Sequence, residues 1–103
     1  MPIFLPKEPS RKELLLTAVM YALSDESRLG IVRQLATKGE QPCGVFEVDR
    51  PKSSLSHHFR VLRESGVVST RKDGKALMNT LRWADLEARF PGLLEVVCGK
   101  RKL

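Results

Sequence analysis

The residues best suited to chemistry lie on one polar face between Ser53 and Ser65. At about 100° per residue, the apolar residues Leu55, Phe59 and Leu62 fall together on one side of a helix. The other side then presents hydroxyl, imidazole, guanidinium and carboxylate groups, from Ser53, His57, Arg60 and Glu64, flanked by Ser56 and Arg63. Hydrogen-bond donors are what the acceptor-rich base edges of the DNA major groove require. The pattern therefore predicts a helix that reads duplex DNA.

Within this face the residue types predict different contacts. We expect Arg60 and His57 to reach base edges, although an exposed His57 with no ligand remains an alternative. Near the helix N-terminus, where backbone N–H groups also point outward, hydroxyl groups suit phosphate; these belong to Ser53, Ser54 and Ser56. His58 falls roughly 60° from the apolar side. We expect it to be half-buried, packed and hydrogen-bonded rather than in contact with DNA.

A basic hairpin is predicted after this helix. The strand-like runs Val67–Thr70 and Ala76–Arg82 flank the sequence Arg-Lys-Asp-Gly-Lys at residues 71–75. Asp-Gly in a short polar link between two such runs is a strong hairpin signal. A solvated turn would explain the charges, but beside a DNA-reading helix we expect phosphate contacts from Arg71, Lys72 and Lys75, joined by Lys52.

The remaining elements must position these two features. Ser10 with Glu13 has the spacing of a capping box and predicts a first helix, Ser10–Leu23. Asp25 or Ser24 would cap a second helix that ends at Gly39, and residues 39–51 leave room for a turn or two of helix. A last helix starts near Trp83 and is interrupted at Pro91-Gly92. The order predicts a mainly α winged helix-turn-helix with a β-hairpin: residues 1–9 an extended arm, 10–98 the domain and 99–103 a basic tail.

Composition agrees with a polyanionic partner. The 103 residues include 18 Lys and Arg against 12 Asp and Glu, a net charge of +6 with a pI near 9.8. Such a balance favours nucleic acid, with an anionic membrane or acidic protein as alternatives. No apolar run is long enough to span a bilayer, and Met1–Pro9 lacks a signal-peptide core. Two cysteines are too few for a disulfide scaffold, so we expect a cytoplasmic protein without a membrane partner.

Two segments together resemble a known family. They are similar to the ArsR (ArsR/SmtB) family of transcriptional repressors. The first segment is Ala22-Leu-Ser-Asp-Glu-Ser-Arg-Leu29, and the second runs from Ser54 to Val68 and contains the pattern S-H-H-x-x-V-L-R-x-x-G. The similarity runs from about Glu13 to Val97. It implies a winged-helix homodimer that binds a palindromic DNA operator and is released by an inducer. The family's dimer interface uses the first and last helices, here Ser10–Leu23 and Trp83–Val97.

The sequence departs from the metal-sensing members of that family. Cys43 stands where their Cys-x-Cys pair would begin, but Val45 occupies the second position, and the last helix contains no histidine. A zinc site needs four N, S or O ligands, so we expect no metal and no cofactor. Cysteine chemistry remains as the inducer signal. A thiol at a helix N-terminus with basic neighbours is open to oxidation or electrophiles, with Cys98 as a disulfide partner; equally, Cys43 is a small buried hydrophobe and Cys98 a tail residue.

Two other classes of function are alternatives. An enzyme would need a nucleophile and a base in a pocket, and only Cys43 with His57 or His58 offers such a pair in a chain with little room for an enclosed site. We therefore predict no enzyme. A winged helix used for protein contacts, or a constitutive architectural DNA binder, would share the fold but lack an operator or an inducer.

Overall fold

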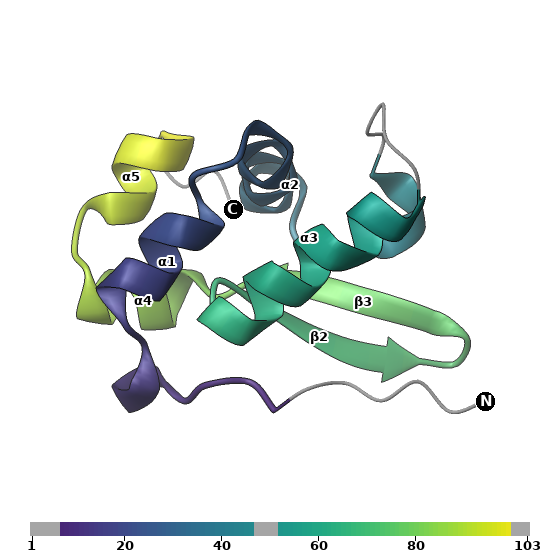
Figure 1. The fold of residues 1–103 in the computed structure, drawn as a ribbon, viewed down its shortest axis with the longest axis horizontal. Helices are drawn as coiled ribbons and strands as arrows, with labels where there is room; N and C mark the ends of the chain where they lie inside the picture. The colour runs from purple at the N-terminus through teal and green to yellow at the C-terminus, as the bar shows by residue number, and fades with distance from the viewer. Residues whose placement is uncertain (1–6, 47–51, 100–103) are drawn as a thin grey trace.

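A computed structural model describes residues 7–46 and 52–99, and it has the helix order and the hairpin that the sequence predicts (Figure 1). Its helices and strands are, in chain order, the 3-10 turn η1 (Arg11–Glu13), α1 (Leu16–Ala22), α2 (Glu26–Lys38), β1 (Gln41–Pro42), the 3-10 turn η2 (Cys43–Val45), α3 (Lys52–Ser65), β2 (Val68–Asp73), β3 (Ala76–Leu81), α4 (Trp83–Arg89) and α5 (Leu93–Cys98). The fold is a winged helix-turn-helix. In the part of the chain described, no helix is long and apolar enough to cross a membrane.

Helix α2 begins and ends as predicted. The Asp25 side chain accepts a hydrogen bond from the Arg28 backbone N–H at 3.0 Å, which satisfies one of the donors that the first turn leaves open. Gly39 ends the helix with φ of 80°, a conformation that side chains disfavour. Between these caps Ile31, Val32 and Leu35 are buried in the core.

The first helix begins later than predicted. The capping box is present, since the Ser10 N–H donates to the Glu13 carboxylate at 2.9 Å, but it closes only the turn η1. Leu14 and Leu15 are extended, and α1 starts at Leu16. Two interactions explain the break: Leu14 is fully buried against Gly66, and Arg89 donates to the backbone carbonyls of residues 11, 12 and 14. Carbonyls that a helix would use internally are thus bound by a side chain of α4.

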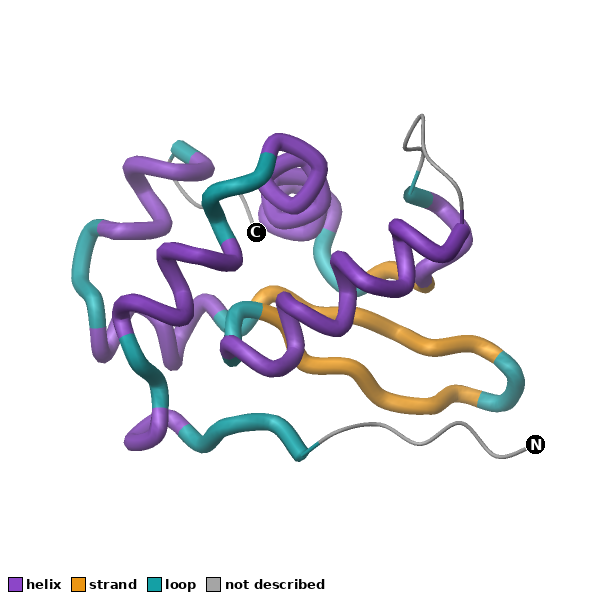
Figure 2. The backbone as a smooth tube through the Cα atoms, in the orientation of Figure 1, coloured by secondary structure: helices purple, strands orange, loops and turns teal. Residues whose placement is uncertain are grey.

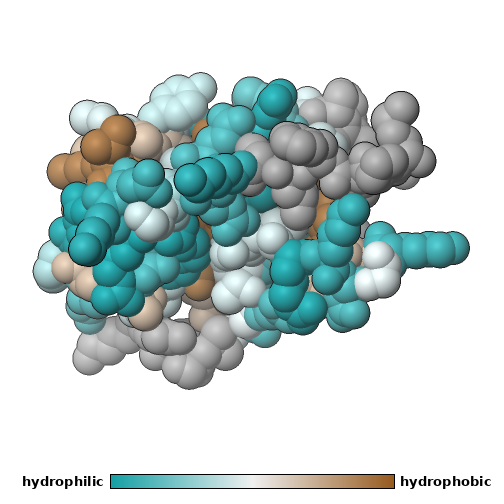
Figure 3. Space-filling view, turned by 90° about the horizontal axis from the view of Figure 1, so that it is seen from below, coloured by the Kyte–Doolittle hydropathy of each residue, from teal (hydrophilic) through white to brown (hydrophobic). Residues whose placement is uncertain are grey.

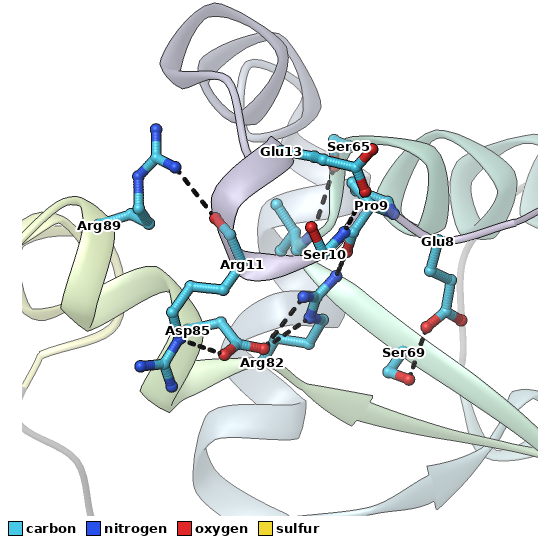
Figure 4. Close-up of polar contacts among 11 residues, drawn as sticks. Glu8, Pro9, Ser10, Arg11, Glu13, Ser65, Ser69, Arg82, Asp85 and Arg89 are labelled. Atoms are coloured by element: carbon cyan, nitrogen blue, oxygen red, sulfur yellow. Dashed lines mark hydrogen bonds and ion pairs between the residues drawn. The ribbon is translucent and has the colours of Figure 1, made fainter.

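The segment before η1 is fastened to the base of the hairpin (Figure 4). Arg82 donates to the Pro9 carbonyl at 2.6 Å, and the Asp85 carboxylate accepts hydrogen bonds from both Arg82 and Arg11. The Glu8 carboxylate accepts bonds from the Ser69 hydroxyl at 2.7 Å and the Thr70 N–H at 2.8 Å. The predicted arm is therefore packed on the domain at residues 8 and 9. Its residues 1–6, and the tail from residue 100 on, lie outside the described residues.

The hairpin is longer than predicted. Its strands pair from Val68↔Leu81 to Asp73↔Ala76, so only Gly74 and Lys75 form the loop (Figure 2). Gly74 has φ of 62°, as the first loop position of a type II′ turn requires. Consequently Arg71 and Lys72 lie on β2 instead of in the loop. A further strand that the sequence did not predict, β1, pairs with β3 and gives the antiparallel order β1-β3-β2.

The predicted interruption of the last helix is confirmed. Gly92 has a left-handed conformation with φ of 86°, and it separates α4 from α5. One side of each helix is buried, through Leu86 and Leu94. These two residues belong to the same core as α2, α3 and the base of the hairpin.

Candidate nucleic-acid interface

Helix α3 packs as the helical wheel predicts. Phe59 and Leu62 are buried, and Leu55 packs partly buried against the same core. Phe46, just before the undescribed residues 47–51, meets Phe59 edge-on with 5.2 Å between ring centroids. Because the apolar side is fixed in this way, the opposite side of the helix must face solvent.

The polar face of α3 is exposed. Ser56, His57 and Arg60 all point to solvent, and Arg60 has 69% of its side chain accessible. Arg60 pairs with Glu64 one turn later at 3.3 Å, an exposed contact that contributes little and is readily exchanged for another partner. Ser54 and Arg63 are half-buried at the margins. Lys52 and Ser53 lie in the first turn of α3, but their side chains lie outside what the structure describes.

His58 is packed and within hydrogen-bond distance of a partner, as expected, but it is buried and not half-buried. Only 6% of it is exposed, and its Nδ1 lies 3.2 Å from the Arg28 guanidinium. Its Nε2 lies 3.9 Å from the Asp25 carboxylate. Arg28 is itself buried and also donates to the backbone carbonyls of Tyr21 and Ala22. Arg28 was not predicted as a partner of this histidine. Its position within the apolar stripe of α2 was a signal, because a buried arginine needs hydrogen-bond partners.

The hairpin forms the wing. Of its three predicted cations, Lys72 and Lys75 make no ion pair within the described residues, whereas Arg71 does. Lys72 and Lys75 are exposed. Arg71 is held by Glu40 through two hydrogen bonds, at 2.6 and 3.1 Å, and Glu40 also accepts from Thr80 at 3.0 Å. The Arg71 bond, followed by the Thr80 bond, keeps the pKa of the Glu40 carboxyl below its ordinary value. A phosphate that binds Arg71 must therefore compete with a carboxylate that was not among the predicted site residues.

Cys43 begins a helical turn, as expected, but this turn has only three residues. It therefore provides little of the dipole on which the predicted thiol activation depended. The thiol is half-buried, and its sulfur accepts a hydrogen bond from the Asn79 amide at 3.1 Å. Cys98 ends α5, where burial raises the pKa of its thiol and the charge of Arg33 partly offsets this. Both cysteines are free thiols.

Residues that lie close to each cysteine in the sequence contact α2. Two consecutive residues of that helix make these contacts. Arg33 donates a hydrogen bond to the Val97 carbonyl at 2.9 Å, and Gln34 donates one to the Gln41 side chain at 2.8 Å. Within residues 7–46 and 52–99, no group of three His, Cys, Asp or Glu side chains is placed to hold a metal ion.

A second surface is apolar. Large hydrophobic side chains are exposed on and beside α1 and on α5: Leu15, Leu16, Met20, Tyr21 and Val96. Both helices lie at the end of the molecule opposite the wing tip (Figure 1). Seen from below, hydrophobic atoms reach the surface at this end (Figure 3). Contiguous exposed apolar side chains usually mark an interface with another macromolecule.

The fold and these surfaces are those of a winged helix-turn-helix transcription regulator. A helix-turn-helix domain family matches residues 23–71. The HTH-type transcriptional regulator YceK of Bacillus subtilis is 39% identical over 82 residues, covering 77% of this chain and 82% of that protein. The arsenical resistance operon repressor of Escherichia coli is 44% identical over 57 residues, 52% of this chain and 47% of that one. The structure of HlyU from Vibrio cholerae superposes with a TM-score of 0.64 at 28% identity, covering 82% of this chain and 91% of that one.

The chain belongs to the ArsR family of DNA-binding winged helix-turn-helix regulators. One of the similar structures is that of reduced HlyU, with a TM-score of 0.63.

Proposed function

We propose that the protein is a homodimeric repressor that binds a palindromic DNA operator and leaves it when Cys43 is oxidised or modified by an electrophile. The observation that carries the DNA contact is the exposed polar face of α3 beside the exposed lysines of the wing. His57 and Arg60 would read base edges. Phosphate contacts would come from Lys52, Ser53, Ser54, Ser56, Arg63, Arg71, Lys72 and Lys75. A DNA partner also implies action in the cytoplasm.

The apolar surface on α1 and α5 supports the dimer. A two-fold axis through that surface would bring the same residues of both protomers together, including Met20 and Val96. Two copies of α3 would then face one side of the dimer, and a two-fold dimer reads a site with the same symmetry. Such a dimer favours a palindromic operator. Repression is favoured by the relative that is a repressor of an operon.

A thiol signal is supported by the contacts of α2 with residues close to each cysteine in the sequence, Val97 beside Cys98 and Gln41 before Cys43. Peroxide would convert the Cys43 thiol to a sulfenic acid with release of water, and the Cys98 thiol could then displace a second water to form a disulfide. The opposing interpretation is structural. Cys43 accepts a hydrogen bond from a buried amide, and Cys98 has a raised pKa that disfavours its thiolate.

Operator binding tests the proposal directly. Duplexes that the reduced protein selects from a random pool are labelled, and binding is followed by fluorescence anisotropy over a range of salt concentrations. The logarithmic salt slope should fall by about 0.9 for each phosphate that is no longer neutralised, and thus by about 1.8 when Lys75→Ala is present in both protomers. Lys12→Ala, which removes an exposed lysine of η1, is the matched control and should leave the slope unchanged.

The same assay tests the signal. Peroxide should weaken binding by the wild type but not by Cys43→Ser, and dithiothreitol should restore the wild type. Equal weakening of Cys43→Ser would refute a role for that thiol. If no duplex is selected, the winged helix serves protein contacts, and the repressor proposal is wrong.

A further inference from the structure

Asn79 lies in the centre of the sheet and is fully buried, with 0% of its surface exposed. It belongs to β3, the strand between β1 and β2. Its side-chain oxygen accepts a hydrogen bond from the Thr70 hydroxyl at 2.7 Å. Its amide nitrogen lies within hydrogen-bond distance of the Gln41 carbonyl (3.3 Å), the Cys43 sulfur (3.1 Å) and the Leu77 carbonyl (3.2 Å). One side chain therefore connects all three strands and the turn that holds Cys43.

The amide of Asn79 has more acceptors than it has hydrogens. A primary amide carries two N–H groups, whereas three acceptors surround this one. The donors must be shared, and a change at any acceptor redistributes them among the others. Because a buried amide that loses a partner is costly, the side chain will follow such a change by moving.

This amide also spans a weak point in the fold. Gln41, Asn79 and Thr70 form one row across the sheet, since Gln41 pairs with Asn79 and Asn79 pairs with Thr70. The strand β1 contributes only two residues to the sheet, so backbone pairing between the wing and the segment after α2 is short. The connection that remains comes from side chains: Glu40 accepts hydrogen bonds from Arg71 and Thr80, and Asn79 links Thr70 to Gln41 and to the Cys43 sulfur.

We propose that Asn79 is a positioning residue that couples the chemical state of Cys43 to the position of the wing. The inference rests on the proposed function for its readout, which is operator binding. A group added to the Cys43 sulfur occupies space around an atom that now lies 3.1 Å from the amide. The amide then turns away from the sulfur, and its oxygen turns with it relative to the Thr70 hydroxyl on β2.

The wing amplifies such a movement. Five residues separate Asn79 from Gly74 at the tip, which at about 3.3 Å per residue is roughly 16 Å. A tilt of about 10° at Asn79 therefore displaces the tip by roughly 3 Å, as much as a hydrogen-bond length. Lys72 and Lys75, near the tip, would lose their phosphates, while the α3 face, whose apolar side is anchored separately by Phe59 and Leu62, would keep its base contacts.

The experiment uses the full chain in a Cys98→Ser background, so that Cys43 is the only thiol. Methyl methanethiosulfonate converts it to a methyl disulfide, because the thiolate attacks the reagent sulfur and expels methanesulfinate. Operator affinity and its salt slope are measured before and after, and dithiothreitol reverses the change. Thr70→Val, which keeps the shape of Thr70 and removes only its hydroxyl, is tested in the same background. Asn79→Leu is tested beside it, with thermal unfolding to verify that each variant folds.

We expect methylthiolation to weaken binding at least tenfold and to lower the salt slope by two or more, with discrimination among operator sequences unchanged. In Thr70→Val the slope should already be lower, and methylthiolation should add less than twofold. If modification weakens both proteins equally and leaves the slope unchanged, Asn79 does not transmit the signal, although Cys43 would remain a sensor. If modification affects neither protein, both the coupling and the sensor role are wrong.

Discussion

Gly66, at the junction of α3 and β2, should not tolerate any side chain. Its φ is +85°, a conformation that costs a residue with a Cβ about 1–2 kcal/mol. A Cβ there would also overlap the Leu14 side chain and lie 2.9 Å from Pro9 Cγ. Overpacking of this kind typically costs about 1–3 kcal/mol. Gly66→Ala should therefore lower the free energy of unfolding by about 2–5 kcal/mol.

Two other glycines separate these contributions. Gly74 also has a positive φ, of +62°, but no heavy atom lies within 4 Å of an added Cβ, so Gly74→Ala should cost only the backbone strain, about 1–2 kcal/mol. Gly30 lies inside α2 with the same open space. Gly30→Ala should stabilise the protein by up to about 1 kcal/mol, because alanine is the better helix former.

Urea unfolding, followed by the fluorescence of the single tryptophan, Trp83, measures all three variants. Protein concentration must be held constant, since association contributes to apparent stability. The expected order of stability is Gly30→Ala, wild type, Gly74→Ala and then Gly66→Ala. If Gly66→Ala and Gly74→Ala were equally destabilised, the close approach of Leu14 to Gly66 would not constrain the fold, and the explanation for the late start of α1 would fail.

Three further predictions concern the surfaces and the cap of α2. Glu40→Gln should free Arg71, tighten operator binding severalfold and steepen the salt slope by up to about 0.9 per protomer; weaker binding in the anisotropy assay would mean that Glu40 positions the wing. The pKa of Asp25 is lowered, first by the Arg28 N–H, so its stabilisation is present above its ordinary pKa and is lost as pH falls through the lower folded value. Asp25→Ala should therefore cost about 1 kcal/mol in urea unfolding near neutral pH and less once the pH falls below the lowered pKa of Asp25, while Asp25→Asn keeps the cap. Met20→Glu places a charge in the exposed apolar surface and should convert dimer to monomer in analytical ultracentrifugation, with no loss of helix content; an unchanged mass would move the interface elsewhere.

Local signals predicted the elements that depend on local chemistry. The Asp25 cap, the Gly39 end, the Gly92 break and the inward set of α3 follow from residue type and spacing alone, and the structure confirms them. The start of α1 was wrong because a distant side chain, Arg89, binds the carbonyls that a continuous helix would use. No window of sequence around Ser10 contains that information.

In the candidate site, too, features that depend on local sequence could be predicted, and contacts between distant residues could not. The polar face of α3 could be predicted from periodicity and the cations of the wing from the hairpin signal, whereas the partners of these residues could not be predicted. Glu40 meets Arg71 across 31 positions of sequence, and Asn79 meets Cys43 across 36. Both contacts depend on the two-residue strand β1, which is too short to leave a pattern in the sequence.

The Glu8 carboxylate has a consequence for self-association. The strand β2 is at the edge of the sheet, and the open N–H groups of an edge strand invite pairing with a strand of another molecule. Glu8 occupies the Thr70 N–H and places a negative charge beside it. A second hairpin that approached this edge would have to displace a carboxylate bonded to both Ser69 and Thr70. Glu8 therefore protects this edge against aggregation of the kind that adds strand to strand.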